Sequence, residues 1–236
     1  MPYAIAHPVA AIPLARVLGR FAVPSALAIG SVIPDAWYLV PGLDRPLSHA
    51  APGLFLFCLP AGLLAYVAFH LLFKEPLLHL LPPGIAVRAR SFACNGLPRA
   101  AWLAVLANLL LGAATHQAWD AFTHAGPFAS RFLDPAVARV LQHASTLLGG
   151  AFLAWWTWRK LKDAPKSTAS VLPSRPRKLV VGGLAAFAGI AFTAMLLLAL
   201  PELELRQSLR VAAVAGACAL GLALFLFALV FRFRRG

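Results

Sequence analysis

Two histidines and an aspartate recur at steps of four near the middle of the chain. The segment 115–124 reads T-H-Q-A-W-D-A-F-T-H and contains His116, Asp120 and His124. On a helix these side chains share one face, and at ~1.5 Å rise per residue the outer two lie roughly 12 Å apart. One ion does not easily bridge that distance, so the spacing favours Asp120 between two metal ions. The alternative is that these residues cap or anchor a helix end in the polar headgroup layer.

Other histidines and acids stand at the ends of expected helices. His7 lies in A-H-P near the N-terminus, Asp35 follows G-S-V-I-P, and His49 and His143 each precede an apolar run. Each alone could be a helix cap or an interfacial residue. Their expected position on one side of a membrane instead favours a shared metal site. The candidate ligands are His7, Asp35, His49, His116, Asp120, His124 and His143.

The composition predicts a membrane protein. Apolar residues make up 61% of the chain and charged residues 12%, against roughly 45–50% and 25% in soluble domains. The expected spans are 54–73, 101–122, 145–158, 179–200 and 209–231. The third is short, but Trp155, Trp156 and Trp158 at its end suit an interfacial belt. We therefore expect an all-α, polytopic membrane helical bundle with about five transmembrane helices and an N-terminal helical hairpin.

The hairpin is expected because the apolar N-terminal stretch is interrupted. Pro13 and Pro24 break the pattern, and in a single span Arg16 and Arg20 would each cost about 2.5–3.5 kcal/mol near the bilayer centre. Two short helices packed against the other spans avoid that cost. They also return His7 to the side on which Asp35 lies.

The distribution of basic residues predicts the topology. The net charge is +13, and most of the 21 lysines and arginines fall in alternate loops and the C-terminal tail. By the positive-inside rule these segments are cytoplasmic, as is the C-terminus, so the loops 46–52 and 122–144 are outside. This alternation points to membrane lipids as partners and away from nucleic acid. The expected divisions are a site-bearing membrane domain over residues 1–162, a basic, proline-rich cytoplasmic linker over 163–177 and a two-helix membrane unit over 178–236.

The order of the motifs carries a resemblance over about residues 3–160. The motifs, in order, are H-P at 7–8, G-S and P-D at 30–35, S-H at 48–49, T-H with W-D and F-T-H at 115–124, and Q-H with S at 142–145. In these the chain resembles an uncharacterised bacterial family of integral membrane proteins. It is also similar to the wider group of inner-membrane proteins called membrane-bound metal-dependent hydrolases. The resemblance implies a bacterial inner-membrane protein with a metal site.

A more distant likeness in ligand order is to zinc-dependent phospholipases C and the fungal single-strand nucleases. It implies one zinc held by Asp35, His49, His116 and Asp120, with further ions at His124 and His143 and at His7 with Asp120, so one to three ions in all. The chain departs from those enzymes at its N-terminus, which is Met1, and at Leu147, where they carry an acid. Only the first of these sites keeps all its ligands.

These observations together predict a metal-dependent hydrolase of phosphate esters on lipid-like substrates, working at the outer face of the inner membrane. Asp120 would bridge metals, and Asp35 would be a ligand or general base. Arg45, Arg131 or Arg139 would bind the phosphate. The alternatives are a metal or proton transporter and a non-catalytic membrane protein with a metal-stabilised fold. A transporter should carry ionisable residues through the depth of the bilayer.

Overall fold

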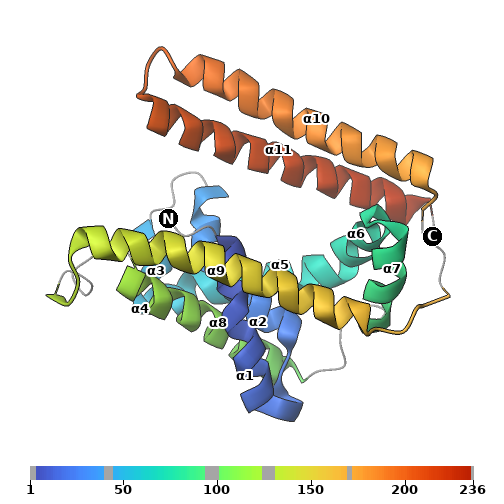
Figure 1. Cartoon of the computed structure of the whole chain (residues 1–236), viewed down its shortest axis with the longest axis horizontal. Coiled ribbons are helices and arrows are strands. Elements are labelled where there is room, and N and C mark those ends of the chain that lie inside the picture. The colour runs from blue at the N-terminus through green and yellow to red at the C-terminus, as the bar shows by residue number, and fades with distance from the viewer. Residues whose placement is uncertain (1–3, 40–44, 94–100, 124–130, 169–171, 235–236) are drawn as a thin grey trace. The chain divides into compact units, whose positions relative to one another are not determined.

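Every regular element of the described chain is a helix, as expected (Figure 1). The computed structural model describes residues 4–39, 45–93, 101–123, 131–168 and 172–234. The chain forms two compact units that are interleaved in sequence. The first unit comprises Met1–Val67 and Pro98–Lys160, and the second comprises Ala68–Leu97 and Leu161–Gly236.

Three helices in the described ranges are long and apolar enough to cross a membrane. They are the continuous helical stretch Ala51–Leu80, α10 (Ser174–Ala199) and α11 (Leu205–Phe233). They match three of the five expected spans. The other two expected spans lie in α8 (Trp102–Thr123) and α9 (Pro135–Lys162), which are long enough. Polar residues lower the mean hydropathy of both helices, so their crossing of the bilayer stays a prediction.

The N-terminal stretch forms short helices in place of one long one. The elements are η1 (Ala4–Ala10), α1 (Ala11–Leu18), η2 (Gly19–Phe21) and α2 (Pro24–Gly30). The backbone turns extended at Ala22, and α2 restarts with Pro24, which suits a first helical position. Asn108 of α8 is buried and satisfies the backbone groups at this break. Its Oδ1 accepts from the Val23 N–H at 2.9 Å, and its Nδ2 donates to the Phe21 carbonyl at 3.0 Å.

Helices α2 and α8 of the first unit approach closely at two glycines. A Cβ added at Gly30 would lie 2.2 Å from the Leu109 carbonyl oxygen, and one at Gly112 would lie 2.3 Å from the Leu27 carbonyl oxygen. No side chain fits at such distances, so the two glycines set how near the backbones come. Leu27 and Leu109 are buried at this contact.

The rest of the first unit connects α2 to the long helix. Its elements are η3 (Ile33–Leu39), α3 (Arg45–His49), α4 (Ala51–Gly53), the π-helical turn η4 (Leu54–Cys58) and α5 (Leu59–Ala68). A small apolar core forms where η3, η4 and α8 meet, around Ile33, Cys58 and Ala113. Ile33 and Ala113 of this core lie two and three residues before Asp35 and His116.

The second unit consists of the end of the long helix, two short helices and the terminal pair. Its elements are the π-helical turn η5 (Phe69–Phe73), α6 (Lys74–Leu80), α7 (Pro83–Ala89), η6 (Arg90–Phe92), α10 and α11. Helices α10 and α11 lie side by side (Figure 1). The start of the expected linker is held against α7, because Ser167 N–H donates to the Val87 carbonyl at 2.8 Å.

Candidate metal centre

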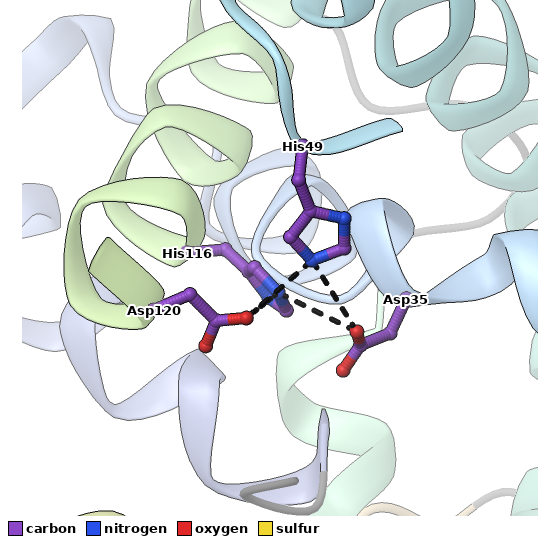
Figure 2. Close-up of side chains that lie close together, drawn as sticks. All are labelled: Asp35, His49, His116 and Asp120. Carbon is purple, nitrogen blue, oxygen red and sulfur yellow. Dashed lines mark ion pairs between the residues drawn. The ribbon is translucent and has the colours of Figure 1, made fainter. Parts of the chain in front are cut away.

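Four side chains from three separate segments of the first unit converge. Asp35 comes from η3, His49 ends α3, and His116 and Asp120 lie one turn apart on α8. Each points a ligand atom at the others, and these atoms all lie within 4.8 Å of one another (Figure 2). We call these four residues the His–Asp cluster.

The distances within the cluster fit ligands around one ion. His49 Nε2 lies 3.4 Å from Asp120 Oδ2 and 3.6 Å from Asp35 Oδ1. His116 Nε2 lies 3.5 Å and 3.6 Å from the same two oxygens. Two ligands that are each ~2.0–2.1 Å from a tetrahedral zinc lie about 3.3 Å apart. Charge-assisted hydrogen bonds would be shorter, at about 2.7–2.9 Å. The spacing is therefore that of neighbouring metal ligands.

The outer nitrogens of both imidazoles are already engaged. His116 Nδ1 lies 2.8 Å from the Ser31 carbonyl oxygen, and His49 Nδ1 lies 2.8 Å from Ser48 Oγ. A carbonyl oxygen only accepts, so His116 donates from Nδ1 and a neutral ring directs the Nε2 lone pair at the carboxylates. Lone pairs facing carboxylates repel unless a cation lies between them or the imidazole is protonated. Metal-binding histidines are oriented by this type of contact on the second nitrogen.

The cluster is largely removed from water. His116 is fully buried, Asp120 is 5% exposed, and the side chains of His49 and Asp35 are 12% and 14% exposed. Within the described residues, the Nε2 atoms of His49 and His116 are buried and take part in no hydrogen bond. Buried polar atoms of this kind usually have a partner. A divalent cation fits this donor set of two nitrogens and two carboxylates.

His7 lies directly against the cluster. Its ring stacks on that of His116 with the centroids 3.8 Å apart and the planes at 26°. Its Nε2 is 3.7 Å from Asp120 Oδ1, the oxygen of Asp120 that faces away from the other two histidines, and the residue is 6% exposed. The folded-back N-terminal helices thus bring His7 to the side of the cluster.

The remaining candidates are placed differently. His124 lies outside the described residues, as does the side chain of Arg45. Arg139 and His143 are exposed on α9, and Arg131, which precedes that helix, is exposed as well. The described contacts do not join these three residues to the cluster, and their assigned roles stay predictions.

The contact of α2 with α8 positions His116. Gly30 and Gly112 allow the two backbones to touch, and Gly112 is one turn before His116 on α8. The touching backbones bring the Ser31 carbonyl, just after Gly30, within reach of the His116 ring. Sequence reasoning missed Ser31 as a positioning residue, because its contribution is a main-chain carbonyl and leaves no mark on residue type.

A second set of contacts positions His49. Gln117, next to His116, donates from Nε2 to the Ser48 carbonyl at 3.0 Å. A Cβ at Gly53 would lie 1.7 Å from the Leu47 carbonyl oxygen, so α4 closes tightly on α3. In sequence, Ser48 stood out only as part of the S-H motif, and nothing indicated a role for Gln117. The signal that could have identified their roles is position, because Gln117 follows His116 and Ser48 precedes His49 in sequence.

Comparison with known proteins identifies a family. Residues 1–231 match a family described as "Domain of unknown function (DUF4184)". No curated protein matches the chain. No solved structure matches it either.

Proposed function

The chain belongs to the family described as a domain of unknown function, DUF4184, and we propose that it is a membrane-embedded, zinc-dependent hydrolase of phosphate esters on lipid-like substrates. The observation that carries the proposal is the pair of buried Nε2 atoms, on His49 and His116, that face two carboxylates at 3.4–3.6 Å. That arrangement calls for a cation, and a two-histidine, two-carboxylate set suits zinc.

The chemistry follows from the donor set. A bound divalent ion supplies Lewis-acid polarisation of a phosphoryl oxygen and makes water acidic enough to ionise near neutral pH. Asp35, His49, His116 and Asp120 would hold the ion. Asp35, the more exposed carboxylate, is also placed to accept a proton from water. His7 and Asp120 Oδ1 offer ligands for a further ion beside the first.

Exposed aromatic residues near the cluster support a lipid-like substrate. Trp119 and Phe122, on the same helix as Asp120, are 50% and 53% exposed. The Trp119 indole also donates to Ser145 Oγ at 3.4 Å, which joins α8 to α9. Tryptophan at the membrane interface contacts both acyl chains and headgroups. We place the site at the outer face of the inner membrane, where an amphiphilic phosphate ester would approach along these side chains.

Metal analysis of the purified full-length protein tests the first step. We expect bound zinc in the wild type and at least one equivalent lost in Asp35→Asn, because an amide is a far weaker ligand than a carboxylate. Asp163→Asn is the matched control, since Asp163 is exposed outside the cluster. Equal metal content in Asp35→Asn and Asp163→Asn would show that Asp35 does not hold the metal, and would contradict the proposed metal site.

Activity is tested separately with zinc-loaded protein in micelles. Short-chain phosphodiester and phosphomonoester lipids are offered, and release of phosphate or of the phosphorylated headgroup is measured. We expect turnover that Asp35→Asn abolishes and Asp163→Asn leaves intact. If zinc is bound but neither ester class is turned over, the hydrolase proposal is wrong. The protein would then be a metal-stabilised membrane protein.

One observation favours a transporter as the second candidate. His70 and Lys74 are buried at 4% and 6% exposure within the apolar stretch Ala51–Leu80, and Lys74 Nζ lies 3.3 Å from His70 Nδ1. Ionisable residues inside a membrane helix are often part of an ion path. Zinc uptake by proteoliposomes that His70→Ala abolishes would support this candidate over the hydrolase.

A further inference from the structure

The second unit contains a buried basic cluster that the proposed hydrolase does not use. Lys74 and His79 of α6 are 6% and 0% exposed, and the side chain of Arg90 in η6 is 12% exposed. Glu75, one residue after Lys74, is the acid that pairs with Arg90. We call Lys74, His79 and Arg90, together with Glu75, the basic cluster.

Arg90 turns back onto α6. One guanidinium nitrogen donates to Glu75 Oε2 at 3.0 Å, and the other lies 2.7 Å from His79 Nε2. The third nitrogen, Nε, is buried and takes part in no hydrogen bond with the described residues. A guanidinium carries only donors, so Arg90 Nε–H has room for one more acceptor.

His79 receives donors on both sides. Its Nδ1 lies 3.1 Å from the Leu172 amide, which can only donate, and its Nε2 faces the Arg90 guanidinium, which also only donates. A neutral imidazole accepts at one nitrogen only. The two donors facing His79 therefore exceed the one acceptor position of its ring. An additional acceptor near Arg90 would resolve this excess of donors.

The formal charges of the basic cluster also favour an additional negative group. Lys74 and Arg90 are two cations against the one carboxylate of Glu75. Arg177 adds another cation at the end of α6, where it donates to the Leu81 carbonyl at 3.1 Å. The other described acids of the second unit, Asp163, Glu202 and Glu204, are exposed. The described residues of this segment thus carry more positive than negative formal charge.

We propose that the basic cluster binds a phosphate group, supplied by the headgroup of an anionic lipid or by free phosphate. Arginine and lysine are the usual phosphate-binding residues, and basic pockets beside membrane helices bind anionic headgroups. The cluster lies at the end of the apolar stretch Ala51–Leu80, on the side that the basic loops predict to be cytoplasmic. Exposed Phe92, close to Arg90 in η6, gives an acyl chain a surface to contact.

The binding is tested on delipidated full-length protein in a neutral detergent. The probes are short-chain phosphatidylglycerol, diacylglycerol of the same chain length, and inorganic phosphate, with binding followed by native mass spectrometry and thermal shift. Binding of phosphatidylglycerol alone identifies a lipid site, and binding of inorganic phosphate as well identifies a general phosphate site. Binding of neither, or equal binding of diacylglycerol, overturns the proposal.

Variants then assign the binding to the cluster. Arg90→Gln should weaken phosphatidylglycerol binding by at least ~10-fold, as expected for loss of a charge-assisted contact. Arg175→Gln removes an exposed charge in the same unit and should leave the binding unchanged. Glu75→Gln should tighten it several-fold, because it removes the carboxylate that competes for Arg90. A misfolded protein would not give that gain, so weaker binding in Glu75→Gln contradicts the proposal.

One further variant separates this site from the metal centre. Asp120→Asn alters the His–Asp cluster in the first unit and should keep the part of phosphatidylglycerol binding that Arg90→Gln removes. If binding falls with Asp120→Asn and not with Arg90→Gln, the phosphate belongs to the metal centre and the proposal is wrong. If the protein shows neither hydrolysis nor bound metal but Arg90-dependent phosphatidylglycerol binding persists, the phosphate site holds independently of the proposed function.

Discussion

At the scale of single residues, Asp120 is the carboxylate of the candidate metal centre that faces three histidines. Its Oδ2 faces His49 and His116, while its Oδ1 faces His7 at 3.7 Å. The two oxygens thus look toward different histidines. This is the arrangement expected if one carboxylate bridges two ions.

Asp120→Asn should therefore lose more than one metal equivalent in a protein that binds two or more. A neutral amide cannot hold two cations at carboxylate distances. The measurement is metal content per chain after dialysis, with His143→Ala beside it. Unchanged stoichiometry in Asp120→Asn would contradict bridging, and an unchanged value in His143→Ala would remove that exposed residue from the ligand set.

Asn108 is a structural residue that spacing alone did not single out. Its amide satisfies the backbone at the break between α1 and α2 and is itself 2% exposed. Asn108→Ala should lower the free energy of unfolding by about 1–3 kcal/mol, since the buried Val23 N–H loses its acceptor. Thermal unfolding in detergent measures this loss. A melting temperature within a degree of wild type would show that the break is held by other contacts.

At the scale of elements, the contact between α2 and α8 decides the geometry of the site. Gly112→Ala should separate the two helices, because the new methyl group would overlap the Leu27 carbonyl at 2.3 Å. The Ser31 carbonyl then moves away from His116, and zinc affinity should fall by about 10–100-fold, as for lost orienting contacts at other metal sites.

The control for Gly112→Ala is Gly182→Ala on α10, where an added Cβ meets nothing within 4 Å. It should leave zinc affinity unchanged and give equal or greater thermal stability, since alanine favours helix more than glycine does. A competition titration with a zinc-binding dye measures both variants. Equal affinities would show that the helix contact does not orient His116.

Much of this architecture was predictable at the level of elements. Apolar run length gave the helical class and three spans, and Pro24 with Arg16 and Arg20 gave the broken N-terminal stretch. The i to i+4 spacing put His116 and Asp120 on one face. The close approach of α2 to α8 was not predictable. A glycine that contacts the backbone of a neighbouring helix cannot be told in sequence from any other helical glycine.

At the scale of the whole molecule, the two candidate sites lie in different units. The first holds the His–Asp cluster, and the second holds the basic cluster and the terminal pair α10 and α11. Within the second unit, residues 68–97 pack with the terminal pair. Packing decides this membership through contacts such as His79 with Phe231, at 4.8 Å between centroids, which are distant in sequence.

The membrane orientation is tested by cysteine labelling in intact cells. In a background that lacks Cys58, Cys94 and Cys218, Phe132→Cys should react with an impermeant reagent from outside, and Lys166→Cys should react only after permeabilisation. Both positions are outside the apolar helices, and the positive-inside rule assigns them to opposite faces. The reverse pattern would place the metal site on the cytoplasmic side.

The origin of the ligands in separate segments also sets an order on biogenesis. Asp35 and His49 leave the ribosome early, whereas His116 and Asp120 follow only after the whole stretch Ala51–Leu80 has been made. A nascent chain halted before α8 therefore offers an ion two of its four donors. An ion held by all four residues would therefore bind only after α8 has been made and has packed on α2.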